Sequence, residues 1–173
     1  YKGSQTSTYA AVKTQMEADR AVFDIDPTLD EPTHAEAARM YLGIKAYLQS
    51  GGLSGYTLHY GECGEDGRFT QLPLLAASNL LADGYGYAAE GDSTAAVLVA
   101  AMQTLCGAAG FTEMYMMDFK REAILMCHQG EGNWRLCRAG RRPYLKNRVL
   151  SEGGLSNPPT PIFTPEPGRA CIL

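Results

Sequence analysis

The sequence predicts a mixed α/β protein, with a Rossmann-like α/β layer over residues 1–107 and a β-rich, antiparallel and barrel-like part over residues 108–173. Helical and strand-like patterns alternate before Gly107, which is the rhythm of an α/β layer. After Gly107 come alternating apolar segments separated by Gly and Pro, a pattern typical of short strands. With 45% hydrophobic and 20% charged residues, the chain of 173 residues has the composition of a globular protein with a real core.

The clearest predicted helix is "THAEAARMYLGIKAYLQ", residues 33–49. Thr33 and Glu36 match the capping-box spacing, in which each side chain satisfies a backbone N–H of the first turn. Gly51 and Gly52 supply the stop signal at the other end. One face of this helix repeats apolar residues at helical spacing, namely Ala37, Met40, Tyr41, Ile44 and Leu48.

The elements that follow continue the α/β alternation. "YTLHY", residues 56–60, predicts a short strand, and the segment 72–83 predicts a second helix with Pro73 in its first turn. A third helix is expected from about Ser93 to Leu105, with Asp92 as its N-cap. The sequence therefore predicts helix, strand, helix, short strand and helix in that order.

A β-hairpin is predicted after this layer. "FTEMYMMDF" (111–119) and "EAILMCH" (122–128) read as two strands around a turn at 119–122. With that turn, two residues face each other across the hairpin when their residue numbers add up to 241. The same residues pair if the loop is longer but symmetric about the turn. Glu113 would then lie opposite His128, with Cβ atoms about 4.5–5.5 Å apart. The methionines of the first strand, Met114, Met116 and Met117, are most simply explained as core packing.

The remaining segments predict edge strands and loops. "RPYLKNRVL" (142–150) is strand-like, and the Pro-rich "NPPTPIFTPEP" (157–167) predicts a rigid loop with an edge strand. The last residues, "GRACIL", are also strand-like, and the first residue is Tyr, so we expect a fragment of a longer protein.

Charge and cysteine content limit the partners and the compartment. The net charge of −4 gives no reason to expect a nucleic acid, and no apolar run approaches the ~20 residues that span a bilayer. The five cysteines form no C-x-x-C pair, which indicates reduced thiols in a cytoplasmic protein. A basic cluster between Arg135 and Arg148 could bind phosphate, or could be a solvated surface or a subunit contact.

Three isolated side chains are candidates for a shared site. Glu90 follows a short strand in the α/β layer, where ligands of open α/β sheets collect, and Glu113 and His128 lie in the predicted hairpin. Two carboxylates and one imidazole suit a divalent ion such as Mn²⁺. Each also has a structural explanation: Glu90 as a helix-dipole partner, Glu113 on a solvent face, and His128 as a hydrogen-bonded structural residue.

The order of motifs in this chain resembles the L-arabinose isomerase family, within the wider fucose/arabinose isomerase superfamily. The resemblance rests on Gln71-Leu72-Pro73, Gly84-Tyr85-Gly86-Tyr87, Ala89-Glu90-Gly91-Asp92, Phe111-Thr112-Glu113-Met114-Tyr115 with Phe119, and the strand ending in His128. It extends from about residue 33 to residue 128, and the ordered set is more specific than any single motif.

The resemblance implies a metal-dependent isomerase that interconverts an aldose and a ketose through a cis-enediol. It implies that Glu90, Glu113 and His128 bind a divalent metal, usually manganese, and that the two Glu also transfer protons. The family's fourth ligand, a His of a later segment, has no counterpart here. Tyr60 is a candidate for binding the small sugar substrate, and the full-length protein is expected to be a homo-oligomer.

Two other functions remain open at this point. The first is a glycosidase that uses Glu90 and Glu113 as an acid/base pair without a metal. The second is a non-catalytic sugar-binding or regulatory module on the same fold.

Overall fold

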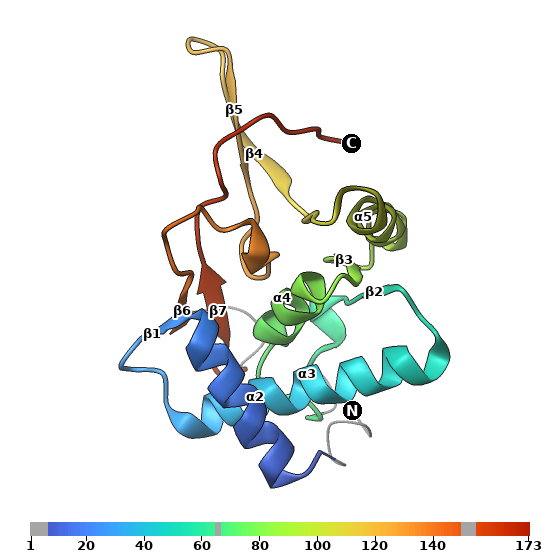
Figure 1. The fold of residues 1–173 in the computed structure, drawn as a ribbon, viewed down its shortest axis with the longest axis vertical. Helices are drawn as coiled ribbons and strands as arrows, with labels where there is room; N and C mark the ends of the chain where they lie inside the picture. Colours follow the sequence, from blue (N-terminus) through green and yellow to red (C-terminus); the bar gives the residue numbers. More distant parts are fainter. Residues whose placement is uncertain (1–6, 65–66, 150–154) are drawn as a thin grey trace.

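The computed structural model describes residues 7–64, 67–149 and 155–173, and these form a mixed α/β fold, as the sequence predicts. Helix α3 lies between α2 and α4, and α5 packs on β2 and β3 (Figure 1). After residue 107 the described part of the chain contains strands and a 3₁₀ turn, without an α-helix and without a closed barrel.

The helices are α2 (Tyr9–Val22), α3 (Glu31–Gly51), α4 (Leu74–Ala82) and α5 (Ser93–Cys106), with 3₁₀ turns η1 (Tyr60–Glu62) and η2 (Trp134–Leu136). The strands are β1 (Asp24–Ile25), β2 (Gly55–Thr57), β3 (Gly86–Ala88), β4 (Glu113–Asp118), β5 (Ala123–Cys127), β6 (Tyr144–Asn147) and β7 (Pro159–Ile162).

Helix α3 begins earlier than the sequence pattern predicts. Its N-cap is Asp30, whose side chain accepts a hydrogen bond from the backbone N–H of Thr33 at 2.8 Å. The predicted capping box of Thr33 and Glu36 is therefore wrong, because Pro32 is favourable in a first helical turn and lets the helix start before Thr33. The predicted end is confirmed, since Gly52 caps the helix in the left-handed conformation with φ of 61°.

Helix α4 is the centre of the core. All nine of its residues are buried, which is the pattern of a helix surrounded by other elements rather than one facing water. Leu80 packs on α3, Leu81 packs against Tyr87 of β3, and Leu75 packs against Phe23 and Leu145. This one helix thus joins the α/β layer to the C-terminal strands.

Strands β2 and β3 pair in parallel and are covered by α5, which begins at the predicted N-cap Asp92. The close packing depends on Gly86. A Cβ atom at this position would lie 2.2 Å from the carbonyl oxygen of Ala96 and 2.6 Å from the Cβ of Ala100. The absence of a side chain at Gly86 therefore lets α5 approach the strand.

Replacing Gly86 by Ala is expected to lower the free energy of unfolding by about 2 kcal/mol, because the added methyl group forces α5 away from β3. Thermal unfolding of the purified protein measures the effect. The control is Gly168→Ala, where a Cβ would have no neighbour within 4 Å and no change is expected. Equal melting temperatures for the two variants would show that α5 adjusts without cost.

Segments from the two ends of the chain form one sheet, which the sequence analysis missed together with α2. Strand β1 pairs in parallel with β6, and β6 pairs antiparallel with the edge strand β7. The predicted strand within 142–150 and the predicted edge strand after Asn157 are confirmed as β6 and β7. The strand-like "GRACIL" forms no strand in the structure.

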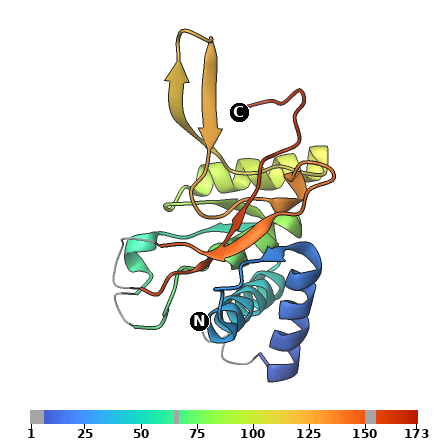
Figure 2. The same cartoon turned by 90° about the vertical axis from the view of Figure 1, so that its left-hand side faces the viewer.

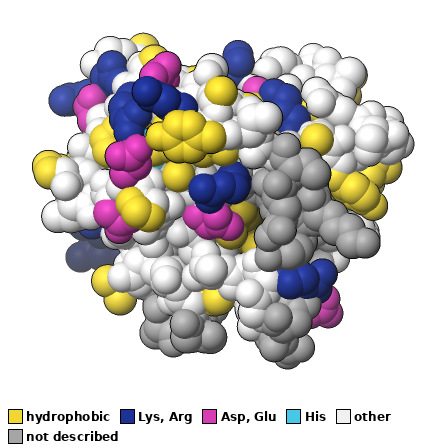
Figure 3. Space-filling view, turned by 90° about the horizontal axis from the view of Figure 1, so that it is seen from below, with side chains coloured by type: hydrophobic (Ala, Val, Ile, Leu, Met, Phe, Trp, Pro, Cys, Tyr) yellow, Lys and Arg dark blue, Asp and Glu magenta, His cyan; other side chains and the backbone are white. Residues whose placement is uncertain are grey.

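The predicted hairpin forms from β4 and β5 and stands away from the rest of the molecule (Figures 1 and 2). The explanation of its methionines as core packing is wrong. Met114, Met116 and Met117 are 55%, 58% and 50% exposed, because no other described element covers either face of the hairpin. The opposite end of the molecule, seen in Figure 3, instead shows acidic and basic side chains next to one another among scattered hydrophobic ones.

A buried polar network connects three helices beneath the C-terminal strands. Asp19 of α2 lies 2.8 Å from the Nε2 atom of His34, and its other carboxylate oxygen accepts from the side-chain amides of Gln15 and Asn79. The indole N–H of Trp134 in turn donates to the Oδ1 atom of Asn79 at 2.9 Å. Since Asp19 and His34 are both 2% exposed, this network is a fixed part of the core.

Two further features of the described residues concern the cysteines and the helices. The five cysteines form no disulfide bond within the described part of the chain. In the described part of the chain, no helix combines the length and apolar character that crossing a membrane would require.

Candidate functional site

The carboxyl ends of β2 and β3 bring two predicted site residues to the same edge. Tyr60 follows β2 and Glu90 follows β3, and the backbone N–H of Gly91 donates to the carbonyl of Leu58 at 3.1 Å, which ties the two connections together. The two strands are parallel, so their carboxyl ends lie at one edge, where ligands bind in open α/β sheets. The expected position of Glu90 at a strand end is confirmed.

Glu90 has an unusual backbone. Its φ is 60°, in the left-handed region that residues other than Gly seldom occupy, and its side chain is exposed. The next acidic residue, Asp92, accepts from the backbone N–H of Ala95 at 2.8 Å and caps α5. The carboxylate of Glu90 is therefore not needed as the helix cap.

The hairpin register differs from the prediction by one residue at the site. Near the turn the observed pairing is the predicted one: the numbers of paired residues add up to 241, as for Asp118 opposite Ala123 and Met116 opposite Leu125. A bulge between Met114 and Met116 then shifts the pairing, and Glu113 faces Cys127. The predicted opposition of Glu113 and His128 is therefore wrong, because the extra residue in β4 moves the rest of that strand by one position.

His128 leaves the hairpin and turns back toward the α/β layer. Its ring packs edge-on against Phe111 with centroids 5.0 Å apart. Its Nδ1 atom lies 3.0 Å from the backbone carbonyl oxygen of Glu131. Since a carbonyl can only accept, Nδ1 carries the proton, and in the neutral ring Nε2 keeps a lone pair for a ligand.

The centre of the site is Glu131, which the sequence analysis missed. Its side chain is 0% exposed. Its Oε1 atom accepts from the hydroxyl of Tyr60 at 2.7 Å and also from the hydroxyl of Tyr87. Among the residues that the structure describes, its Oε2 atom has no hydrogen-bond partner, and it lies 3.9 Å from the Nδ1 atom of His128. One buried carboxylate thus connects the strand ends of the α/β layer with the segment that holds His128.

Burial and the Glu131 carboxylate raise the pKa values of the surrounding tyrosine hydroxyls. Both raise the pKa of Tyr87 well above its ordinary value, and burial followed by Glu131 does the same for the pKa of Tyr56. For Tyr60 the pKa is raised by burial, then by Glu131, with a smaller contribution from Glu90. The three hydroxyls therefore stay protonated at neutral pH, and Tyr60 lies within the electrostatic reach of Glu90.

The predicted metal ligands are chemically suitable, but the chain does not gather them. Two carboxylates and the Nε2 atom of His128 are ligands that Mn²⁺ accepts. Within residues 7–64, 67–149 and 155–173, no three His, Cys, Asp or Glu side chains lie close enough together to hold a metal ion. Glu90, Glu113 and His128 thus form no complete ligand set within this chain, and their role as metal ligands stays a prediction.

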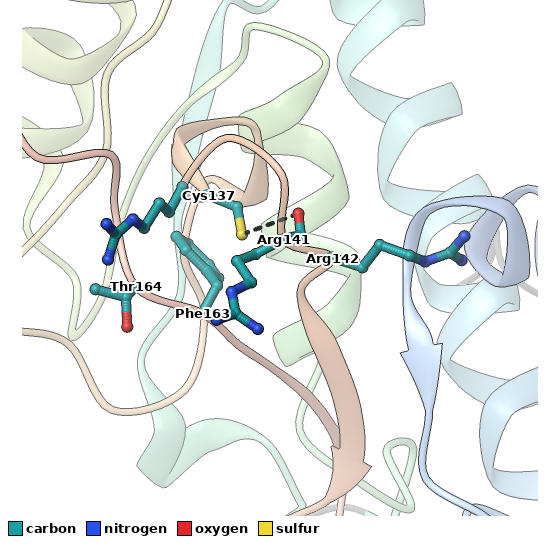
Figure 4. A pocket seen from close by; sticks show the side chains of 6 residues that line it. Cys137, Arg141, Arg142, Phe163 and Thr164 are labelled. Carbon is teal, nitrogen blue, oxygen red and sulfur yellow. Dashed lines mark hydrogen bonds between the residues drawn. The ribbon is translucent and has the colours of Figure 1, made fainter.

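A separate basic hollow lies beside η2. It has a volume of about 250 Å³ and is lined by arginines together with Cys137, Phe163 and Thr164 (Figure 4). Arg142 points toward the N-terminal segment, where its Nε atom lies 2.9 Å from Asp24 and its Nη2 atom donates to the carbonyls of Arg20 and Phe23. Within the basic cluster between Arg135 and Arg148, Arg142 therefore has a structural role.

Comparisons with known proteins match nearly the whole sequence. A family model for the L-arabinose isomerase central domain matches residues 4–108, and a model for the L-arabinose isomerase C-terminal domain matches residues 108–173. The L-arabinose isomerase of Nocardioides sp. is 34% identical over 144 residues, which are 79% of this chain and 27% of that protein. That of Levilactobacillus brevis is 34% identical over 149 residues, 82% of this chain and 30% of the relative. That of Clavibacter sepedonicus is 30% identical over 180 residues, 96% of this chain and 34% of the relative. The chain thus spans about a third or less of the length of these relatives.

Proposed function

The chain belongs to the L-arabinose isomerase family, and we propose that it forms part of an enzyme that interconverts an aldose and a ketose. The relatives that it matches are named for this activity on L-arabinose, which makes L-arabinose the first substrate to test. One observation carries the proposal. Tyr60 lies at the same strand-end edge as Glu90, and the buried Glu131 connects Tyr60 with the segment that holds His128.

Aldose–ketose interconversion moves a proton from C2 of the sugar to C1 through a cis-enediol. The reaction needs a base and an acid on the reacting carbons, and carboxylates serve in both roles. We assign these roles to Glu90 and Glu113, and the binding of a sugar hydroxyl to Tyr60. A divalent ion such as Mn²⁺, when bound with His128 and the two carboxylates, supplies Lewis-acid polarisation of the sugar carbonyl. We infer that other parts of the whole protein complete the ligand set.

The whole protein that contains this chain is expected to convert L-arabinose into its ketose, to lose this activity after dialysis against a chelator, and to regain it with Mn²⁺. Proton NMR of the sugar measures the conversion. The isolated 173-residue chain is the comparison, and no turnover is expected from it. Full activity of the chelated protein would contradict the metal dependence, and no conversion of any pentose or hexose would contradict the proposed function.

The same experiment separates the alternatives. A glycosidase would cleave a glycoside without a metal and leave free arabinose unchanged, whereas a sugar-binding module would bind the sugar without converting it. The proposal also includes a cytoplasmic, homo-oligomeric whole protein, and sedimentation velocity of the whole protein tests the oligomer.

A further inference from the structure

The segment that begins at η2 concentrates positive charge. Residues 133–150 include six basic residues and no Asp or Glu, although the whole chain has a net charge of −4. Two of the six are engaged elsewhere in the fold. Arg142 binds Asp24 and two backbone carbonyls, and the guanidinium of Arg135 lies over the ring of Trp134, 5.7 Å from its centroid. Neither of these two is the obvious binder of an external anion.

Arg138 and Arg141 line the basic hollow beside η2, and both are exposed. Among the described residues neither side chain has a carboxylate partner, since the arginine ion pairs found there are those of Arg39, Arg121 and Arg142. A guanidinium stays protonated in proteins at any working pH. The hollow therefore presents two positive charges that no salt bridge neutralises.

A tight turn holds these two arginines at a fixed spacing. The backbone N–H of Arg141 donates to the carbonyl of Arg138 at 3.1 Å, and Gly140 between them has φ of 75°. A β-turn with a left-handed third residue keeps its first and fourth Cα atoms within about 7 Å. The backbone N–H of Arg138 also donates to the carbonyl of Thr164 at 2.9 Å, which fixes the turn against the C-terminal segment. The backbone of the two arginines is thus preorganised.

The other side chains of the hollow suit an anion joined to an apolar group. Figure 4 shows the side chain of Arg141 next to the ring of Phe163, which is partly exposed. Thr164 is exposed and brings a hydroxyl that can donate to an oxygen. Burial raises the pKa of the Cys137 thiol, so this group stays neutral at neutral pH and adds no negative charge. The hollow thus combines two guanidinium groups, a hydroxyl and an aromatic face.

We propose that this hollow binds a phosphomonoester dianion between Arg138 and Arg141, and that Phe163 contacts the small sugar that carries it. The guanidinium fork matches two phosphate oxygens, and two such forks balance the charge of about −1.5 to −2 of a phosphomonoester at pH 7. The volume of about 250 Å³ lies below the roughly 300–1,000 Å³ of pockets for drug-sized ligands, which favours a sugar phosphate over a nucleotide. The hollow is separate from the Glu131 cluster, and its test requires no turnover.

Calorimetry of the whole protein with ribose 5-phosphate, inorganic phosphate and ribose tests the site. Ribose 5-phosphate is expected to bind, with an affinity that falls as salt is added. Inorganic phosphate should bind about two- to tenfold more weakly, because it lacks the contact with the aromatic ring. An excess of ribose or L-arabinose should not displace ribose 5-phosphate, since the phosphate group is what the hollow recognises.

Charge variants assign the binding to the hollow. Arg138→Gln and Arg141→Gln should each weaken it about tenfold, the effect of losing one charge-assisted hydrogen bond. Glu166 accepts from the backbone N–H of Ala139 within the turn, so its carboxylate opposes a bound anion. Glu166→Gln keeps an acceptor but removes the charge, and should strengthen binding about two- to fivefold. Arg121→Gln is the matched control, because it removes the same charge at the hairpin turn and should change nothing.

Several outcomes would overturn the proposal. Absence of ribose 5-phosphate binding, or its displacement by ribose or L-arabinose, would place no phosphate in the hollow. Wild-type affinity in both Arg138→Gln and Arg141→Gln would do the same, and an equal loss in Arg121→Gln would reduce the effect to net charge. Equal affinities for ribose 5-phosphate and inorganic phosphate would remove Phe163 and the sugar from the site. A whole protein without isomerase activity would contradict the proposed function and leave these decisions unchanged.

Discussion

Replacement of Glu113 by Gln in the whole protein is expected to lower kcat by about a hundred- to ten-thousandfold while the fold remains intact, because this is the usual contribution of a side chain that transfers a proton. The amide keeps the size of the side chain but cannot take a proton and has no negative charge. Glu113 is half-buried at the base of β4, where it faces Cys127, and Gln fits the same place. Steady-state kinetics with L-arabinose measures the loss, and circular dichroism checks the fold.

The matched control is Glu122→Gln, which makes the same chemical change at an exposed position in the turn of the same hairpin. It is expected to keep kcat within about twofold, as surface substitutions away from a site do. A Glu113→Gln variant with kcat close to the wild type would remove Glu113 from the chemistry. A further readout is the Mn²⁺ affinity measured by calorimetry, which should fall in Glu113→Gln and remain unchanged in the control.

Replacement of Asp19 by Ala is expected to destabilise the protein by about 3–5 kcal/mol, the usual cost of leaving the partners of a buried charge without it. Asp19 is the common acceptor for His34, Asn79 and Gln15, and these come from three helices. Removal of the carboxylate leaves these donors buried without an acceptor. Thermal unfolding of the whole protein measures the change in melting temperature. The melting temperature of Asp19→Asn should lie between those of the wild type and Asp19→Ala.

The surface pair of Glu36 and Arg39 provides the control for this experiment. Its atoms lie 2.6 Å apart, closer than those of Asp19 and His34, but the side chains are 29% and 39% exposed. Glu36→Ala should therefore cost less than about 1 kcal/mol, since water replaces the lost partner. If Asp19→Ala and Glu36→Ala lowered the melting temperature equally, burial of the network would not be the source of its stability.

The parts of the fold that the sequence predicted correctly are those fixed by local patterns. The boundaries of α5 follow from the cap at Asp92 and from Gly107, and the end of α3 follows from Gly52. The turn of the hairpin was also correct, because the residues next to it pair as expected. The position of Glu90 at the end of a strand was also predicted correctly, because the short strand before it is a local signal as well.

The missed parts depend on contacts between distant residues. Glu131 stands between two glycines, a context that suggests an exposed loop, and its burial comes from Tyr60 and Tyr87, which lie 71 and 44 residues away. The bulge at Tyr115 adds one residue to β4 without changing the alternating pattern that predicts a strand. The pairing of β1 with β6 likewise joins the two ends of the chain, and a two-residue strand has no periodicity to detect.

The left-handed backbone of Glu90 has an evolutionary consequence. A glutamate with φ of 60° costs about 1 kcal/mol relative to a glycine, which adopts this conformation freely. Selection for folding alone would therefore favour Gly at this position, and the proposed role of the carboxylate is what would oppose it. If Glu90 has the proposed role, Gly or Asn at position 90 among descendants of this sequence would mark lineages that have lost the activity and gained stability.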